Sequence, residues 1–240
     1  MRTRRAGRLR TGVVLTLLAA LWLPSPAARS APQGDAAALA ALSGLRDAFI
    51  RRIDAEGYHP CPAPAIELGD PPNFGRYDRE RNTLVIASWG HLAAPERRSF
   101  EDMAQGMGGS VPAEAMFENG TYRWVIVHEL GHWWQSCRQQ ARPESYAAEN
   151  GANRIALAFW REHDPRYALG IVTGFRALLE SAPSPLPEGV TPEAYLDEKF
   201  ARVAESEEYT WFQAEMIVAL AHESPPPSFH KALSQPLYPY

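Results

Sequence analysis

The sequence predicts an α+β fold, in which a small β-sheet or hairpin accompanies a mainly helical body. Two short segments rich in aromatic and β-branched residues, FGRYD and TLVIASW, flank the turn-like RERN, as in a hairpin. Most of the remaining chain carries apolar residues at helical spacing. Of the 240 residues, 45% are hydrophobic and 22% are charged, so the chain can bury one core and a single domain is expected.

Residues 1–30 have the pattern of a secretory signal peptide. Residues 1–10 are rich in Arg, residues 11–23 contain no charge, and small residues follow over 24–31. The apolar stretch is too short for a membrane helix, which needs about 20 residues. We therefore expect Sec-type export to the periplasm or the exterior, no stable membrane anchor after cleavage, and one mature domain over 31–240.

The charge distribution excludes one class of partner. The net charge is −4, but residues 1–30 hold six Arg and no acidic residue, which leaves 18 basic and 28 acidic residues in the rest of the chain. A polyanion would be repelled by that remainder, so no nucleic-acid partner is expected. A peptide or protein substrate and a monomeric state are expected instead.

The first helix and the strands belong to the N-terminal part of the mature chain. Residues 35–56 have apolar residues at helical spacing, with Asp35 as a possible N-cap and Gly57 as the stop. Residues 58–72 are rich in Pro and carry the short apolar segment AIEL before the two strands. A short helix is expected over 95–107.

Helices are expected to fill the rest of the chain. The break Arg142-Pro143 separates the first two of them, and Thr191-Pro192 is typical of a helix start, with Pro at the first helical position. The tail over 224–240 is rich in Pro and Tyr and is expected to pack on the surface or to fray. The expected helical ranges are 121–139, 144–162, 165–180, 192–206 and 209–223.

The motif HELGH at 128–132 carries the chemistry. On a helix, His128 and His132 project from one face, one turn apart, at the separation that two imidazoles need to bind one metal ion. Glu129 lies beside the first ligand, where it could take a proton from a metal-bound water and pass it to a leaving amine. Gly131 weakens a helix, which makes sense if another backbone passes close to the site.

A catalytic zinc site needs a third protein ligand and one open position. The chain has Gln135 and Arg138 where a metzincin extension would have Gly and His, so that kind of ligand is excluded. Glu149, 17 residues after His132 on the next expected helix, is the preferred third ligand. Asn153 lies one turn later on the same face, where it could orient a ligand imidazole.

Other interpretations of these residues stay open. The two histidines of the motif could satisfy ordinary hydrogen bonds without a metal. Glu149 and Asn153 could form an exposed polar stripe on a surface helix. Glu144, near the helix start, and His163 and Asp164, at its far end, are weaker ligand candidates.

HELGH followed by a Glu on the next helix and an Asn one turn later resembles the gluzincin group of zinc metallopeptidases, to which thermolysin belongs. The resemblance covers 128–153, and ENGANRIA is similar to the ligand helix of small single-domain bacterial metallopeptidases. It implies a zincin-like fold and Glu129 as general base, with Asn153 behind the ligands where thermolysin-like enzymes use Asp. The ligands that it implies for one Zn²⁺ ion are His128, His132 and Glu149.

An enzyme of this kind also needs a donor that stabilises the oxyanion formed when water attacks a peptide carbonyl. Tyr209, His222 and His230 come late enough to fold over the site, and Tyr209 is the first choice. Tyr209 could equally pack as an aromatic side chain on the apolar face of its helix. The remaining histidines outside the motif are expected to be ordinary surface or hydrogen-bonded residues: His59, His91 and His163.

Two further features leave alternatives open. The strand TLVIASW could offer a free edge to an extended peptide, or it could be an internal strand hidden by the first helix. In an oxidising compartment Cys61 and Cys137 could form one disulfide, or they could remain two buried thiols.

These patterns together predict an exported zinc metallopeptidase, which hydrolyses peptide bonds with a zinc-activated water and Glu129 as general base. The main alternative is a catalytically inactive zinc- or peptide-binding protein of the cell envelope. A third class is a structural or interaction protein of the envelope that binds no metal.

Overall fold

The structure is a computed structural model, and it describes residues 34–59, 61–106, 108–140 and 144–235. The predicted signal peptide at 1–30 lies outside these residues. Within them, no helix is both long enough and apolar enough to cross a membrane. The described chain is mixed α+β and mostly helical with a small sheet, which confirms the predicted fold class at that level.

Three strands form a mixed sheet in the order β1–β3–β2. β1 (Ala65–Gly69) runs parallel to β3 (Thr83–Ala87), and β2 (Gly75–Asp78) runs antiparallel to β3. The Pro-rich segment contributes β1 through AIEL, so the sheet is larger than a hairpin. Because β3 is paired on both sides, the interpretation of TLVIASW as a free edge is wrong and its internal position is confirmed. The helix that packs against β3 is α5 (Arg123–Cys137), however, whereas the first helix, α2 (Asp35–Ala55), packs against β1.

Helices make up most of the other described residues. Three short turns accompany them: η2 (Pro72–Phe74), η3 (Trp89–His91) and the π-helical η4 (Phe117–Tyr122). The α-helices are α2 (Asp35–Ala55), α3 (Ala94–Gly106), α4 (Ala113–Met116), α5 (Arg123–Cys137), α6 (Tyr146–His163), α7 (Pro165–Ser181), α8 (Pro192–Ala204), α9 (Glu208–Ala221) and α10 (Phe229–Ser234).

Helix α2 begins one position away from the expected N-cap. Asp35 is its first helical residue, and Gly34, at φ 89°, takes the N-cap position. Glycine adopts this conformation without the steric penalty that a β-carbon brings. The helix ends at Ala55 and Gly57 follows at φ 83°, so the predicted stop signal is confirmed.

The helix that carries HELGH starts well before residue 121. α4, η4 and α5 form one continuous rod over 113–137, because the backbone at both junctions stays in the right-handed helical region. The dipeptide Asn119-Gly120 has the composition of a turn. The chain nevertheless stays helical there, and the Tyr167 hydroxyl donates a hydrogen bond to the Gly120 carbonyl oxygen at 2.9 Å.

The C-terminal segment packs on the rest of the protein as α10. The Ser228 hydroxyl caps this helix by accepting a hydrogen bond from the Lys231 N–H. Phe229 is fully buried, and its ring centroid lies 5.5 Å from that of Phe49 and 5.8 Å from that of Phe159. Fraying is therefore excluded for residues 229–234, whereas 236–240 lie outside the described residues.

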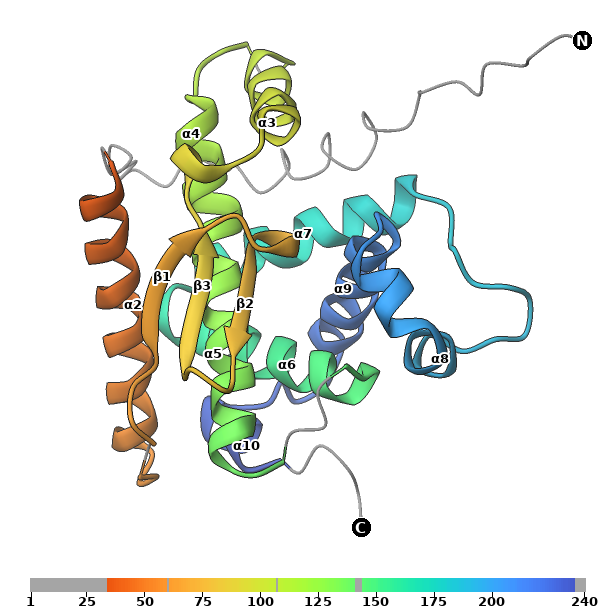
Figure 1. Cartoon of the computed structure of the whole chain (residues 1–240). Helices are drawn as coiled ribbons and strands as arrows, with labels where there is room; N and C mark the ends of the chain where they lie inside the picture. The colour runs from red at the N-terminus through yellow and green to blue at the C-terminus, as the bar shows by residue number, and fades with distance from the viewer. Residues whose placement is uncertain (1–33, 60, 107, 141–143, 236–240) are drawn as a thin grey trace, which may run out of the picture.

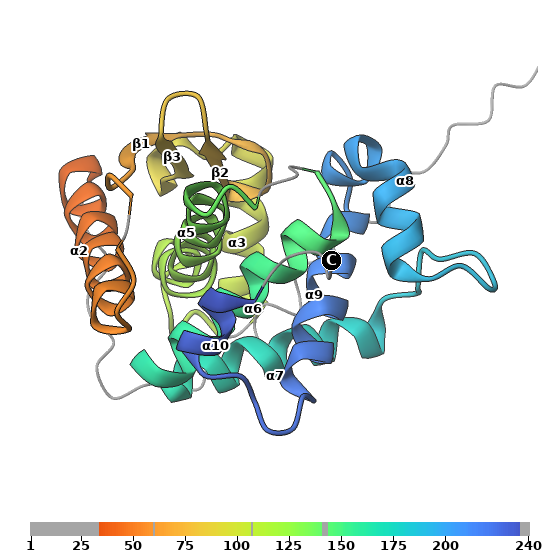
Figure 2. The same ribbon diagram turned by 90° about the horizontal axis from the view of Figure 1, so that it is seen from below.

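Helix α5 lies at the centre of the molecule, across one face of the sheet (Figure 1). α2 lies beside β1, while α6, α7 and α9 lie on the other side of α5 (Figure 2). α8 lies at the periphery and packs against α9. Contacts on several sides bury the middle of α5 completely, at Ile126, Val127 and Leu130, so its polar residues are held in a rigid frame.

A disulfide joins Cys61, in the segment before β1, to Cys137, the last residue of α5. It therefore ties the strand-bearing part of the chain to the end of the central helix.

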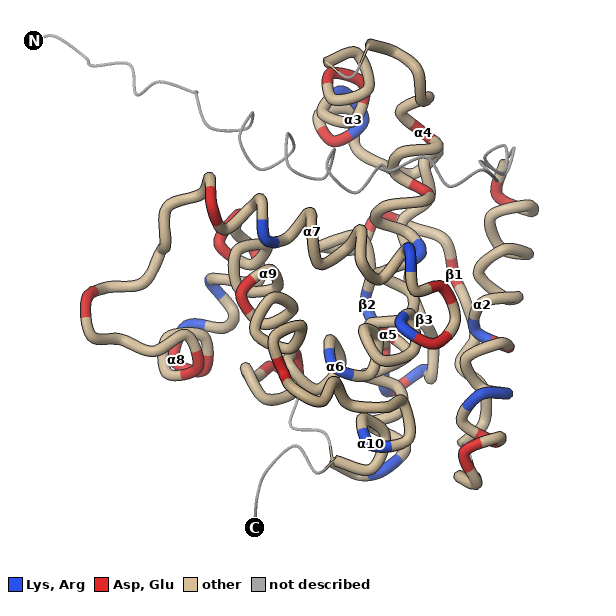
Figure 3. Tube along the Cα trace, turned by 180° about the vertical axis from the view of Figure 1, so that it is seen from behind, with Lys and Arg blue, Asp and Glu red and all other residues tan. Residues whose placement is uncertain are grey.

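On the surface, residues of both charge signs are interspersed along α2 and α3 (Figure 3). Arg52 of α2, for example, forms ion pairs with Glu56 and Glu162.

Candidate metal centre

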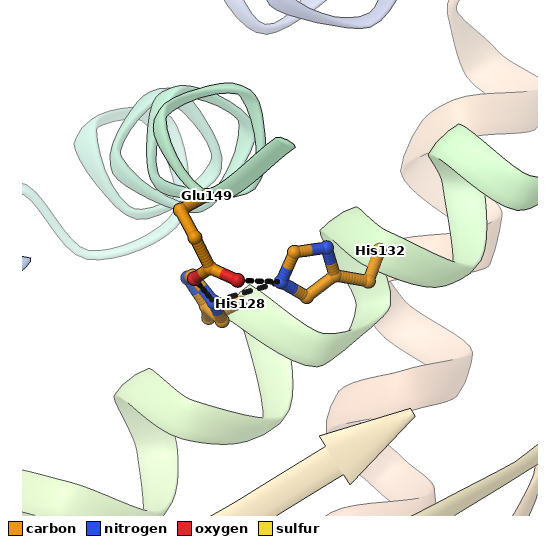
Figure 4. A group of neighbouring side chains, drawn as sticks. All are labelled: His128, His132 and Glu149. Carbon is orange, nitrogen blue, oxygen red and sulfur yellow. Dashed lines mark hydrogen bonds and ion pairs between the residues drawn. The ribbon is translucent and has the colours of Figure 1, made fainter. Parts of the chain in front are cut away.

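Three side chains that commonly bind metals meet between α5 and α6 (Figure 4). The Nε2 atoms of His128 and His132 are 3.1 Å apart. Glu149 brings Oε2 to 3.2 Å from His128 Nε2 and Oε1 to 3.4 Å from His132 Nε2. The two imidazoles come from successive turns of α5 and the carboxylate from the first turn of α6. This group could hold one metal ion.

The close approach of α5 and α6 brings these ligand atoms together. Gly131, between the two histidines, lies against the backbone of Ala152, which confirms the expectation that another backbone passes close to it. Ser145 fixes the start of α6, because its hydroxyl accepts a hydrogen bond from the Ala148 N–H at 3.2 Å. Glu149 is therefore directed at α5 from the first turn.

Two amide side chains fix the tautomers of the histidines. His128 Nδ1 lies 2.9 Å from Asn153 Oδ1, and His132 Nδ1 lies 3.1 Å from Gln135 Oε1. The NH₂ groups of both amides donate hydrogen bonds to other residues: that of Asn153 donates to Gln213 Oε1, and that of Gln135 donates to the Ala148 carbonyl oxygen. Each Nδ1 therefore carries a proton, so that in the neutral form of each imidazole the lone pair is on Nε2, the atom that faces the common centre.

The carboxylate of Glu149 is held by donors from α9. The Tyr209 hydroxyl donates to Glu149 Oε2 at 2.7 Å, and Gln213 Nε2 donates to the same oxygen at 2.9 Å. Burial, together with the nearby Glu149 charge, raises the pKa of Tyr209 well above 10, so the phenol keeps its proton and remains a donor. Because Oε2 already accepts two hydrogen bonds, Oε1 is the freer oxygen for a cation.

The electrostatics of the group favour a positive charge at its centre. Burial alone would lower the pKa of His132, but the Glu149 carboxylate outweighs it and raises this pKa to about 9. Burial would also raise the pKa of Glu149, yet the His132 charge and hydrogen bonds from both imidazoles hold it well below 4.5. A proton on His132 or a metal ion would each satisfy this preference.

Glu129 lies beside His128 and is held by β2. Its Oε2 accepts a hydrogen bond from the Tyr77 backbone N–H at 2.7 Å, and the side chain is buried. Among the ligands, the side chains of His128 and Glu149 are each 7% exposed, whereas that of His132 is 20% exposed. Solvent therefore reaches the centre mainly past His132.

The weaker candidates lie in other contacts. His163 stacks on Phe159 with ring centroids 5.0 Å apart, and Asp164 caps α7 and pairs with Arg123. His222 is the C-cap residue of α9, and His230 pairs with Glu56 at 3.2 Å. His91 Nδ1 lies 2.7 Å from the Ser88 hydroxyl. His59 and Glu144 are exposed surface residues.

Three groups of the site were missed by the sequence interpretation: the amides of Gln135 and Gln213 and the backbone N–H of Tyr77. Helical spacing held a signal for the first two. Gln135 follows His132 by three residues on α5, and Gln213 follows Tyr209 by four on α9, so each lies on the same helix face as a candidate. No sequence pattern identifies a backbone donor.

The described chain is thus an α+β protein whose buried His–His–Glu group could hold a metal ion. Comparisons with protein families, with curated proteins and with solved structures found no match.

Proposed function

We propose that this chain is an exported zinc metallopeptidase of the gluzincin type with a zincin-like fold. One observation supports the proposal most: the two Nε2 atoms lie 3.1 Å apart, and the Glu149 carboxylate places Oε2 3.2 Å from His128 Nε2 and Oε1 3.4 Å from His132 Nε2. Tetrahedral zinc, with bonds of about 2.0–2.1 Å, places neighbouring ligand atoms about 3.3–3.4 Å apart. The donor set of two imidazoles and one carboxylate is also one that catalytic zinc uses, with a fourth position left for solvent.

The charges of the site support a dication. Glu129 and Glu149 are both buried, and both histidines present neutral Nε2 lone pairs once Nδ1 is protonated. With both imidazoles neutral, as metal binding requires, the two carboxylates would leave a charge of −2, which a divalent ion would neutralise. The amides behind the histidines would hold them in the ligand tautomer, as the outer shell of a metal site requires.

The peptidase assignment is supported by the residue order. The motif HELGH, the third ligand on the next helix and Asn153 behind His128 together resemble gluzincins, and the buried carboxylate beside the first ligand fits a general base. Bound zinc would supply Lewis acidity that polarises a peptide carbonyl and acidifies a water. Glu129 would take a proton from that water and deliver it to the leaving amine.

Tyr209 remains the first choice for the oxyanion donor. Its hydroxyl reaches the candidate metal centre but donates its hydrogen bond to Glu149. The hydroxyl would therefore have to turn from Glu149 to the reacting carbonyl during the reaction.

Glu129→Gln tests the proposal. This variant should keep one equivalent of zinc, measured by elemental analysis, and should lose at least 100-fold in the rate at which a mixed peptide library is cleaved. Glu188→Gln, in an exposed loop, is the control and should behave as the unaltered protein. Hydrolysis at the original rate in Glu129→Gln contradicts the mechanism.

Two other outcomes assign the chain to another class. If the unaltered protein binds zinc but cleaves no peptide of the library, whether or not a chelator is added, the chain is a metal- or peptide-binding protein. Failure to retain any metal would leave a structural or interaction protein.

A further inference from the structure

We propose that strand β2 positions the general base, through the backbone N–H of Tyr77. This inference rests on the proposed function, because it assigns Glu129 the role of base. The strand acts through Glu129 and does not itself touch the reacting atoms, so Tyr77 and Gly75 are positioning residues. The metal ligands are held independently, by α9 and by the amides behind the histidines.

The hydrogen bond is directed at one oxygen of the carboxylate. Tyr77 N donates to Glu129 Oε2 at 2.7 Å, a short distance typical of a donor facing a charged acceptor. Alternate residues of an antiparallel edge strand turn their N–H groups away from the ladder, and the Tyr77 N–H donates to Glu129 of α5. Among the described residues, Glu129 Oε1 makes no hydrogen bond, so one oxygen is anchored and the other is available for a proton transfer.

Gly75 makes this contact possible. A β-carbon at Gly75 would lie 2.1 Å from Val125 Cγ1 and 3.2 Å from Glu129 Cγ. The strand therefore packs directly on α5. A β-carbon at position 75 would be too close to the side chains of both Val125 and Glu129. Any larger residue at position 75 would push β2 away from the helix and lengthen the Tyr77–Glu129 hydrogen bond.

The strand is fixed at both ends. At its start, Asn73 and Phe74 adopt positive φ angles of 55° and 68°, and Asn73 Nδ2 donates to the Ala204 carbonyl oxygen at 2.9 Å. At its end, the Tyr77 hydroxyl donates to Asn82 Oδ1 at 3.1 Å. Left-handed conformations at two successive non-glycine residues persist only where surrounding contacts impose them, and such residues are typical of functional sites.

A freely rotating glutamate would spend part of its time away from a reacting water. A carboxylate held by one oxygen loses that freedom before the substrate arrives, which favours proton transfer without changing substrate affinity. The inference therefore predicts an effect on kcat rather than on KM.

The contact itself is tested by amide hydrogen exchange, which needs neither metal nor activity. In the unaltered protein the Tyr77 amide should be protected, although it lies on a free strand edge. Glu129→Ala should speed exchange at Tyr77 at least tenfold, whereas Glu188→Ala should leave it unchanged. Equal exchange in Glu129→Ala and the unaltered protein would overturn the inference.

The role is tested with Gly75→Ala in the zinc-loaded protein. We expect one equivalent of zinc, a KM within threefold of the original, a kcat lowered 10- to 100-fold and faster exchange at Tyr77. Gly69→Ala, on the opposite edge strand, is the matched control; its β-carbon would lie 3.3 Å from the Val85 side chain, which has to move only slightly. An unchanged or higher kcat in Gly75→Ala overturns the positioning role.

A rescue variant covers the case in which Gly75→Ala does not fold. Val125→Ala removes the atom that the new β-carbon would strike, so Gly75→Ala combined with Val125→Ala should fold and recover at least part of the lost kcat. Val125→Ala alone should stay within threefold of the original rate. A folded double variant with full kcat and slow Tyr77 exchange agrees with the inference; full kcat with fast exchange contradicts it. If the unaltered protein cleaves no peptide, the proposed function fails first, and the exchange data still decide whether the contact exists.

Discussion

Gly131 of α5 and Ala152 of α6 are in direct backbone contact. A β-carbon at position 131 would lie 2.9 Å from Ala152 Cα and 3.1 Å from the Ala152 carbonyl oxygen. Real β-carbons essentially never lie within 3.0 Å of another heavy atom, and backbone moves less readily than the end of a side chain. Since Gly131 lies between the two candidate histidine ligands, and Ala152 lies one turn from Glu149, this contact sets the distance between the two halves of the centre.

Gly131→Ala should therefore destabilise the protein. Alanine is the better helix former by up to about 1 kcal/mol, but the clash with Ala152 outweighs this gain and should leave a net loss of about 1–3 kcal/mol. Urea unfolding measures the change. Gly44→Ala, in α2 with no atom within 4 Å of the new β-carbon, is the matched control and should gain stability. A Gly131→Ala variant as stable as the control would show that α6 moves away without cost.

Gln213→Ala should weaken metal binding without removing a ligand. The Gln213 side chain donates to Glu149 Oε2 and accepts from Asn153 Nδ2, so its loss frees the carboxylate and unfixes the amide behind His128. Outer-shell changes of this kind cost about 10- to 100-fold in affinity. Competition with a chelator measures the zinc Kd, and Gln105→Ala, on an exposed position of α3, serves as control. Equal affinities in the two variants would contradict the role given to Gln213.

Reduction of the Cys61–Cys137 disulfide should lower the free energy of unfolding. The bridge closes a loop with a sequence separation of 76 residues, for which loop-closure entropy gives about 4 kcal/mol. Urea unfolding with and without a reductant measures the difference. A double variant with Ser at both positions should match the reduced protein and should not respond to the reductant. Identical unfolding curves for the oxidised and reduced protein would exclude this contribution.

The local features of the candidate site were accessible from the sequence. The spacing of His128 and His132 follows from helix geometry alone, and the next predicted helix brings Glu149 to the same place. The sheet was less accessible. β1 pairs with β3 in parallel, although β2 lies between these two strands in the sequence. A pairing of this kind has no connecting turn, so no hairpin signal predicts it.

The contacts that sequence patterns did not predict are those between distant elements. The Tyr77 N–H meets Glu129 from 52 residues away, and Gln213 meets Glu149 from 64 residues away. The continuous rod was not predicted, since the expected helix began at residue 121; Asn119-Gly120 has the composition of a turn, yet the chain stays helical there. Local periodicity thus indicates which residues could bind a metal ion, and the packing of α9 and β2 decides how their side chains are held.

Glu118 in the π-helical turn η4 should make stability depend on pH. Glu118 is 7% exposed, and within the described part of the chain its Oε2 finds no hydrogen-bond partner. Burial, reinforced by the charge of Glu114, raises the pKa of Glu118 from 4.5 to about 7. Between these two values the folded protein keeps a proton that the unfolded chain has released. The contribution of Glu118 to stability is therefore full below pH 4.5 and is lost as the pH rises to about 7.

The variant Glu118→Gln isolates this contribution, because a neutral amide of similar shape does not titrate. Relative to the unaltered protein, the variant should gain about 2 kcal/mol between pH 4.5 and pH 8, and most of the gain should appear between pH 5 and pH 7. Urea unfolding at a series of pH values measures the difference in the free energy of unfolding between the two proteins. The titration of all other groups contributes equally to both and cancels. Glu188→Gln, in an exposed loop, should show no such trend. A difference that stays constant from pH 4.5 to pH 8 would mean that the Glu118 carboxylate is ionised in the folded protein, and that η4 therefore supplies it with a partner such as an ordered water.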